Sequence, residues 1–387
     1  MAHRMSGRAA ICGLGMTEFG RVYRSATDLA TEAVLLALAD AGLEKSQLDG
    51  LLINTGTTQG VNIGLHTKLG LSELNVLTFM QGYGSTAGQM IQYAAMAVEN
   101  GMADYICCVF ADDPLQEGKR TGDAYAGNRR REAMTSLYPI YGFAGAIPMY
   151  AMGAQRHMDT YGTTQEHLGQ IAISQREWAA FNEQATKREP LDMEAYHASP
   201  WVVDPFHVLD CCLVSNGGVA VIVTSAERAQ DAAQPPVYIR GFAQQHRHDT
   251  GKADLDPLLY GPGKKSGEKA LAMAGASLAD ITQCQIYDCY TYTVLVTLED
   301  YGFCAKGEGG PFVADGRLGP GGTLPTNTGG GELSSFYMWG MTPVTEAVIQ
   351  GRGHGGERQV DNDLILVTGN GGVLNYHSTL LLSPQAA

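Results

Sequence analysis

The chain has 387 residues, which at about 100 to 200 residues per domain is enough for two or three units with a large core. Charged residues make up 17% of the sequence, against about 25% in an average soluble domain, and the 49 glycines are nearly twice the usual share of about 7%. The formal net charge of -14 argues against nucleic acid as the main ligand, because phosphate binding requires basic patches. We therefore expect an acidic, soluble enzyme with many tight turns.

Cysteine usage and the lack of long apolar runs predict a location in the reducing cytoplasm. Four of the eight cysteines lie in adjacent pairs, Cys107 with Cys108 and Cys211 with Cys212, and none has a Cys-x-x-Cys spacing. This pattern favours neither a disulfide framework nor a structural metal site. The N-terminal residues lack the apolar segment of a signal peptide, and no later apolar run approaches the length of a membrane span.

The first part of the chain predicts alternating strands and helices. Its opening strand is followed by Gly13-x-Gly15, but Glu18 stands where a dinucleotide-binding loop needs its third glycine, so we expect only a tight turn there. A helix ending in ALADAG then precedes a polar turn and a short buried strand, Gly50–Asn54.

A second copy of this pattern lies in the C-terminal part of the chain. ALADAG begins at Ala37 and ALAMAG begins at Ala270, and the two differ at one position. The register holds without a gap, so the counterpart of the strand Gly50–Asn54 is expected at residues 283–287.

A looser repeat follows the first one in each half. Residues 84–101 and 334–351 each run from a Gly/Ser-rich turn into a helix ending in Ala-Val-x-x-Gly, and a strand follows each, at residues 105–110 and 364–368. Two copies of a βαβαβ unit imply two similar α/β halves with largely parallel, buried strands.

The segment between the halves has a different composition. Residues 112–204 carry many charges and turn residues and contain two helical patterns, at 147–161 and 164–182. We interpret this segment as an insertion over the active face of the first half, with residues 211–225 returning as a strand of that half. The expected division is 1–111 plus 205–233 for the N-terminal half, 112–204 for the inserted loop domain and 234–387 for the C-terminal half.

Several motifs accompany the two halves in a fixed order. They are AAICGLGMTEFG, Asp-Cys-Cys before SNGGVAVIVTS, and LPTNTGGGEL followed by EAVIQGRG. Together they resemble the thiolase superfamily, in its sterol-carrier and lipid-transfer branch, over nearly the whole chain. The resemblance implies the α/β thiolase fold, in which two pseudo-symmetric βαβαβ halves form five αβαβα layers. It also implies a tight homodimer and an acyl-CoA substrate.

The residues that a thiolase uses for catalysis are missing. A thiolase needs a cysteine thiolate at a helix N-terminus and a histidine that activates it. The turn that should carry the cysteine reads GYGSTAG from Gly82, and the turn that should carry Gly-His-Pro reads LSSF from Leu333. Acylation of Ser85 remains an alternative, although without a base its hydroxyl stays protonated.

Two tyrosine motifs account for these losses. The sequence YDCYT begins at Tyr287, and Tyr337 follows a few residues after Gly-Gly-x-Leu. Both resemble the acyl-CoA aldolases of steroid side-chain degradation, which cleave a β-hydroxyacyl-CoA by a retro-aldol reaction with tyrosines in place of cysteine and histidine. The resemblance assigns the catalytic roles to Tyr287 and Tyr337. Asp288 has either a catalytic or a structural role, because strand alternation points it to the opposite face.

The rest of the predicted site follows from the chemistry. Retro-aldol cleavage needs a base for the β-hydroxyl proton, stabilisation of the thioester enolate and an acid for the α-carbon. Ligand sites in open α/β sheets collect at strand ends, so the two phenols could face one pocket. The candidates for oxyanion or substrate binding are Ser85, Gly330, Gly331, Asn370, Gly371 and His377, with turn backbone or simple packing as the alternative.

The leading hypothesis is a carbon-carbon lyase. It would cleave a bulky, ring-bearing β-hydroxyacyl-CoA, such as a steroid side-chain thioester, to a ketone or aldehyde and a short acyl-CoA. No bound cofactor or metal is expected beyond the coenzyme A of the substrate. The resemblance also implies a small OB-fold and zinc-ribbon partner in a heterotetramer. The alternatives are a thiolase-like acyltransferase without the usual cysteine and a non-catalytic subunit that binds acyl-CoA or lipid.

Overall fold

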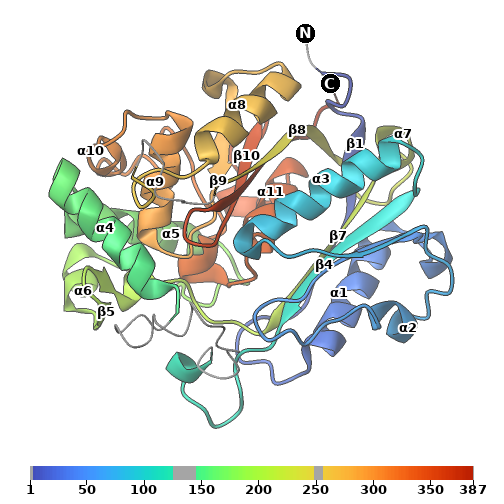
Figure 1. The fold of residues 1–387 in the computed structure, drawn as a ribbon, viewed down its shortest axis with the longest axis horizontal. Coiled ribbons are helices and arrows are strands. Elements are labelled where there is room, and N and C mark those ends of the chain that lie inside the picture. Colours follow the sequence, from blue (N-terminus) through green and yellow to red (C-terminus); the bar gives the residue numbers. More distant parts are fainter. Residues whose placement is uncertain (1–2, 125–144, 248–255, 387) are drawn as a thin grey trace.

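The computed structural model describes residues 3–124, 145–247 and 256–386, and the structural statements below concern these residues. Alternating strands and helices build the N-terminal half, as its apolar periodicity predicts (Figure 1). Its elements are β1 (Ala9–Met16), α1 (Ala26–Ala41), β2 (Gly50–Asn54), α2 (Leu65–Leu69), β3 (Val76–Phe79), α3 (Thr86–Glu99), β4 (Tyr105–Asp112), β7 (Gly217–Ser225) and α7 (Ala226–Ala229).

The inserted segment forms a helical group against α9 and α10 of the C-terminal half (Figure 1). Its elements are α4 (Ile147–Tyr161), α5 (Gln165–Ala179), α6 (Met193–Ala198), β5 (Trp201–Val203) and β6 (Phe206–His207). The C-terminal half contains β8 (Val237–His246), α8 (Gly263–Ala274), β9 (Gln283–Gln285), α9 (Thr291–Tyr301), α10 (Gly309–Val313), α11 (Met341–Gly351), β10 (Ile365–Gly371) and β11 (Tyr376–Ser383).

Nine strands form one mixed sheet in the order β3-β2-β4-β7-β1-β8-β11-β10-β9. The order consists of two related half-sheets, since β2, β4, β7 and β1 correspond to β9, β10, β11 and β8. The halves meet where β1 and β8 pair antiparallel, with Ala10 opposite Tyr238 and Ile11 opposite Val237. The parallel pairs are β2 with β3, β2 with β4, and β9 with β10. The two similar halves expected from the repeats are therefore confirmed, although each also contains antiparallel pairs.

Helices cover both faces of each half-sheet. α1 packs on β1, β4 and β7, and α8 packs on β8 and β11. α3 contacts strands of both halves, and α11 contacts β9, β10 and β11 as well as β1, so these two helices lie between the half-sheets (Figure 1). The result is the expected series of five layers. Strands with helices on both faces are buried on both faces, which agrees with the low share of charged residues.

Glycines bring the outer helices close to the sheet. A Cβ atom at Gly13 would lie 2.5 Å from the carbonyl oxygen of Ala37, and one at Gly15 would collide with that of Ala33. Gly241 of β8 has the same relation to Ala270 of α8. The expectation of a tight turn at Gly13 and Gly15 was wrong, because both lie inside β1. They are glycines because α1 crosses directly over the strand.

Several predicted elements have the expected bounds and others are shorter. The strand Gly50–Asn54 and the helix Ile147–Tyr161 agree with the prediction. The strand expected at 283–287 ends at Gln285, and the one expected at 211–225 begins only at Gly217. No helix in the described ranges is long and apolar enough to span a membrane.

Candidate active site

The hydroxyl groups of Tyr287 and Tyr337 lie 3.1 Å apart, at hydrogen-bond distance. Tyr287 follows β9, and its N–H donates to Oγ1 of Thr368 in β10 over 3.2 Å. Tyr337 follows the helical turn Gly331–Ser335, and its N–H donates to Oγ of Ser215 over 3.1 Å. The backbones of both tyrosines are thus anchored to neighbouring segments. The two phenols therefore meet, while a shared substrate pocket and their catalytic roles remain predictions.

The surroundings of Tyr287 favour its protonated form. Its side chain is buried, and burial raises the pKa of the phenol well above 10, with smaller contributions from Tyr337 and Cys289. A phenol of this kind does not ionise at neutral pH in the free protein. It can still donate one hydrogen bond and accept another.

Asp288 holds the turn that leads to Tyr337. Its buried carboxylate accepts the N–H of Glu332 at 2.9 Å and that of Leu333 at 3.2 Å. Burial raises the pKa of Asp288 to about 7, and these two hydrogen bonds offset part of the rise. Gly331 has a positive φ of 59°, and a Cβ atom there would collide with the carboxylate. The contacts therefore favour the structural role of Asp288 over a direct catalytic one.

The turn before α3, which corresponds to a thiolase nucleophile turn, packs directly against the tyrosine pair. A Cβ atom at Gly84 would collide with the ring of Tyr287 and the carbonyl oxygen of Asn370. A Cβ atom at Gly371 would likewise run into the carbonyl oxygen of Gly82. The close approach of these backbones therefore requires glycine on both sides.

Ser85 is bonded within its own turn. Its buried hydroxyl donates to the carbonyl oxygen of Gly82 over 2.6 Å and accepts from Nε2 of Gln89 over 2.7 Å. Its N–H also bonds to Gly82, over 3.2 Å. These bonds occupy the hydroxyl and the backbone donor, so the geometry does not favour acylation of Ser85.

Of the candidates for oxyanion binding, Asn370 has the clearest free donor. Its Oδ1 accepts a 3.4 Å hydrogen bond from Oη of Tyr150, while its buried Nδ2 has no acceptor among the described residues. Gly330 differs, because its N–H already donates to the carbonyl oxygen of Asn327 over 2.8 Å. An unpaired buried donor is costly unless a ligand uses it, so Asn370 is the stronger candidate.

His377 takes a different place from the one expected. Its Nε2 lies 2.9 Å from Oη of Tyr301 in α9, and its ring lies beside Gly263 at the start of α8. Burial lowers the pKa of His377 to about 3, so the imidazole stays neutral. The prediction of a substrate-binding role is not supported, because the side chain packs between the strand and the outer helices.

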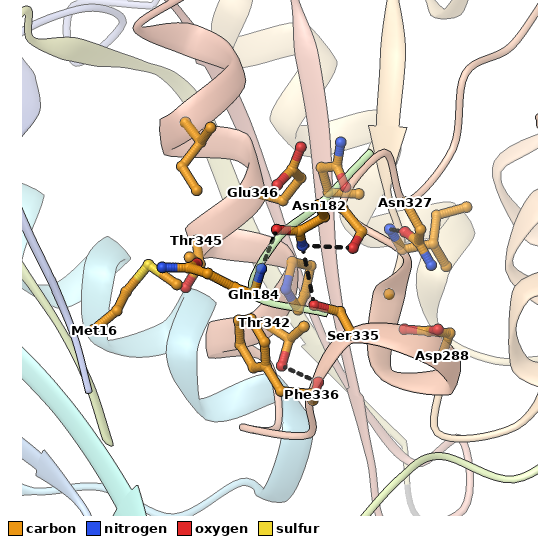
Figure 2. A pocket seen from close by; sticks show the side chains of 16 residues that line it. Met16, Asn182, Gln184, Asp288, Asn327, Ser335, Phe336, Thr342, Thr345 and Glu346 are labelled. Carbon is orange, nitrogen blue, oxygen red and sulfur yellow. Dashed lines mark hydrogen bonds between the residues drawn. The ribbon is translucent and has the colours of Figure 1, made fainter. Parts of the chain in front are cut away.

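Figure 2 shows a small cavity beside the Gly331–Ser335 turn. Asn182 crosses it, and its Nδ2 donates to the carbonyl oxygen of Gly329 at 2.8 Å and to Oγ of Ser335 at 3.2 Å. Asp288 lines this cavity, but neither tyrosine of the pair does. The space open to a water-sized molecule is about 10 Å³, which is about one water. The residues that line the cavity hold the turn in place, and the cavity itself is too small for an acyl group.

Two side chains beside the tyrosines were not singled out from the sequence. Tyr150 of α4 packs on Tyr290 with ring centroids 4.7 Å apart, and its hydroxyl lies against Cys289. Glu332 is completely buried and lies within the turn itself. For Glu332, the sequence offered one signal of burial, namely a carboxylate within a run of small and apolar residues. From the sequence, Tyr138, Tyr141 and Phe143 of the inserted segment are candidates for a wall of the substrate pocket, and all three lie outside the described residues.

Comparisons with known proteins extend over nearly the whole chain. Residues 242–384 match the family model described as thiolase C-terminal domain-like. A protein of Thermomonospora curvata named steroid side-chain-cleaving aldolase is 38% identical over 388 residues, covering 95% of this chain and 96% of that protein. The 17-hydroxy-3-oxo-4-pregnene-20-carboxyl-CoA lyase of Mycobacterium tuberculosis is 36% identical and covers 95% of this chain and 98% of its own. A solved structure described as the Ltp2-ChsH2(DUF35) aldolase has a TM-score of 0.87 at 37% identity and covers 98% of both chains.

Proposed function

Because this chain belongs to the thiolase-like steroid side-chain-cleaving aldolases, we propose that it cleaves a β-hydroxyacyl-CoA by a retro-aldol reaction. The observation that carries the proposal is the 3.1 Å contact between the hydroxyl groups of Tyr287 and Tyr337. The pair lies where the turn of the N-terminal half meets that of the C-terminal half. A thiolase would have its cysteine and histidine in these turns.

The reaction moves one proton and breaks one carbon-carbon bond. The β-hydroxyl loses its proton and becomes the carbonyl of a ketone or aldehyde. The electron pair of the breaking bond passes to the α-carbon and the thioester, giving an enolate. Protonation of the α-carbon then gives the short acyl-CoA. Substrate and products have the same total charge, so the enzyme needs no external acid or base.

The tyrosine pair is suited to transfer this proton without forming a stable phenolate. One hydroxyl accepts the proton of the substrate hydroxyl while it passes its own proton to the second hydroxyl, 3.1 Å away. In the same concerted transfer the second hydroxyl passes its own proton to the α-carbon, so neither phenol oxygen carries two protons. Such a relay returns both phenols to their starting state. It is consistent with the burial that keeps Tyr287 neutral.

The enolate oxygen needs a donor in a site shielded from water. The buried Nδ2 of Asn370, which has no acceptor among the described residues, supports a role in binding it. The backbone at Gly331 and Gly371 remains a secondary candidate, because Gly330 already donates its N–H to Asn327.

The names of the relatives suggest the acyl group and the assembly. We assign to this chain a substrate with a steroid or similarly bulky ring next to the hydroxyl-bearing carbon, bound as a coenzyme A thioester in the cytoplasm. The description of the Ltp2-ChsH2(DUF35) structure supports a second, small subunit, which we expect around a homodimer of this chain.

Turnover of ring-bearing β-hydroxyacyl-CoA substrates tests the proposal. The chain should be assayed alone and with any subunit that co-purifies from its native host, with release of the ketone or aldehyde and of the short acyl-CoA as the readout. We expect equal amounts of the two products. Tight acyl-CoA binding without cleavage under both conditions would support a binding subunit instead.

A further inference from the structure

Glu332 carries a buried carboxyl group without a hydrogen-bond partner. Its relative exposure is 0%, and neither carboxyl oxygen meets a donor among the residues that the structure describes. The described ion pairs do not include it. By contrast, buried Glu299 has both carboxyl oxygens bonded, to His157, Lys306 and two backbone N–H groups. Burying a carboxyl without such partners is costly, so its presence in the core calls for an explanation.

The backbone of Glu332 is fixed on both sides. Its N–H donates to the carboxylate of Asp288 over 2.9 Å, and its carbonyl oxygen accepts the N–H of Leu213 over 2.9 Å. The turn that contains Glu332 continues directly into Tyr337. The side chain therefore has little freedom to move out of the core.

The carboxyl group lies beside the peptide that joins Tyr287 to Asp288. The N–H of Asp288 is close enough to lower the pKa of Glu332 slightly, but it makes no hydrogen bond of normal geometry. The charge of an ionised Glu332 would also act on Tyr287 and Cys289. Through its bond to Asp288 and its place in the turn before Tyr337, Glu332 is therefore a neighbour of the tyrosine pair.

These surroundings keep the group protonated. Burial raises the pKa of Glu332 well above its usual range, and the nearby carboxylate of Asp288 raises it further. A protonated carboxyl group has one O–H donor, and here that donor has no acceptor within the described residues. An apolar site with a neutral carboxylic acid is a known way to stabilise an enolate oxygen by a hydrogen bond.

We propose that Glu332, as a neutral carboxylic acid, donates a hydrogen bond to the substrate's thioester oxygen while the enolate forms. This inference rests on the proposed retro-aldol function and names a second donor besides Asn370. Glu332 keeps its proton throughout, so the tyrosine relay remains the only path of proton transfer. The hydrogen bond strengthens as negative charge develops on the oxygen, which is the condition for lowering a barrier.

The test uses the enolate half of the reaction, so it does not depend on the identity of the ring. Propionyl-CoA and acetone, whose carbonyl oxygen accepts the proton at the far end of the relay, are incubated with the protein in D₂O, and exchange of the α-hydrogens of propionyl-CoA is followed by NMR. Two variants separate the roles of the carboxyl. Glu332→Met keeps the approximate volume and removes the donor, and Glu332→Gln keeps a neutral donor but has no acidic proton.

Glu332→Met should exchange about 100-fold more slowly than the wild type, the usual loss on removal of one oxyanion donor. Glu332→Gln should stay within about 10-fold of the wild type. Wild-type exchange rates in Glu332→Met would overturn the inference, because the group would then be only structural. Equal losses in both variants would also overturn it, because a transferable proton would then be required. Absence of exchange in the wild type would overturn the proposed function itself.

Glu299→Gln is the matched control, since it makes the same change in another buried glutamate. Glu299 lies in α9, where it contacts His157 of the inserted segment. It should lower the melting temperature and leave exchange within about 3-fold. An equal loss of exchange in this control would mean that the losses follow stability, and the inference would fall.

If Glu332→Met does not fold, the affinity for propionyl-CoA is measured instead. The wild type should bind propionyl-CoA more tightly than its thioether analogue, which lacks the oxygen, and Glu332→Gln should keep that preference. An equal affinity of the wild type for both would contradict the inference.

Discussion

In the N-terminal half, β2 ends at Asn54 and the turn before α3 carries Ser85. In the C-terminal half, β9 is followed by Tyr287 and the turn before α11 carries Tyr337. The first pair bonds to its own backbone, since Asn54 accepts from the N–H of Gly56 over 3.2 Å and Ser85 bonds to Gly82. The second pair meets hydroxyl to hydroxyl. Equivalent turns of the repeat thus have different tasks.

The difference indicates how a duplicated fold can change its chemistry. The N-terminal turn contributes close backbone packing, because Gly84 lets it lie against the ring of Tyr287. The C-terminal turn contributes side chains, and buried Asp288 holds it in place. One half therefore shapes the site and the other half supplies its reactive groups.

Removal of either phenol should have the largest effect. Tyr287→Phe and Tyr337→Phe should each lower retro-aldol turnover by about 100-fold to 10,000-fold, the usual contribution of a positioned acid or base. The folded structure should persist, since the ring remains in place. Steady-state kinetics of the purified variants check this.

Tyr301→Phe is the control for the tyrosine variants. Its hydroxyl bonds to His377 on the outer side of the C-terminal half. It should cost about 1 kcal/mol of stability and leave turnover within about 3-fold. A loss of turnover as large as that in the Tyr337→Phe variant would contradict the assignment of the reactive groups to Tyr287 and Tyr337.

The pH dependence of stability should distinguish the site from the scaffold. The folded pKa of Asp288, about 7, exceeds its unfolded value of about 3.9, so ionisation is disfavoured in the folded state. Relative to Asp288→Asn, the wild type should therefore lose stability as the pH rises from about 4 to about 7, by at most about 4 kcal/mol. Urea unfolding across this range measures the difference.

Glu299 should show the opposite slope. Burial raises its pKa, but the hydrogen bond from His157 and the charge of Lys306 lower it more, so the folded pKa lies below its ordinary value. Its contribution should be present above the unfolded pKa of about 4.3 and disappear as the pH falls below that value. Slopes of the same sign in Asp288→Asn and Glu299→Gln would remove this contrast between site and scaffold.

Gly84→Ala tests whether the N-terminal turn shapes the site. The added Cβ collides with the ring of Tyr287, so we expect a loss of about 1 to 3 kcal/mol in stability and a loss of turnover larger than stability alone explains. The control is Gly101→Ala, at a positive φ of 68° but with open space around the Cβ, which should reduce stability only. Equal turnover losses in both would contradict a shaping role.

The smallest effect is expected from Ser85→Ala. The change removes two buried hydrogen bonds, to Gly82 and from Gln89, so it should cost about 1 to 2 kcal/mol in the free energy of unfolding. Turnover should stay within about 3-fold of the wild type. Loss of all activity, or an acyl-enzyme trapped on Ser85 in the wild type, would revive the acyltransferase alternative.

Much of the scaffold could be predicted because it depends on local patterns. The strand Gly50–Asn54 and the helix Ile147–Tyr161 follow from apolar periodicity, and the repeat then placed the counterpart of the strand, β9. Residues 211–216 were expected to be strand because they are largely apolar. In the structure, Cys212 and Leu213 instead donate to the carbonyl oxygens of Cys289 and Glu332. Those partners lie in the other half, so no local signal could reveal them.

The site was predictable only in part for the same reason. Tyr287 and Tyr337 could be found because their motifs resemble those of a family with known chemistry. The burial of Glu332 and the contact of His377 with Tyr301 depend on which segments, distant in the sequence, pack around each side chain. Neither periodicity nor composition specifies those segments.

A double-mutant cycle on Tyr287 and Tyr337 tests the central claim most directly. If the two hydroxyls form one relay, removal of either breaks it, and the Tyr287→Phe/Tyr337→Phe enzyme should be no more than about 3-fold slower than the slower single variant. The measurement is the rate of cleavage of one ring-bearing β-hydroxyacyl-CoA by the four proteins. A double variant slowed by the product of the two single losses would show that the phenols act independently and would contradict the relay.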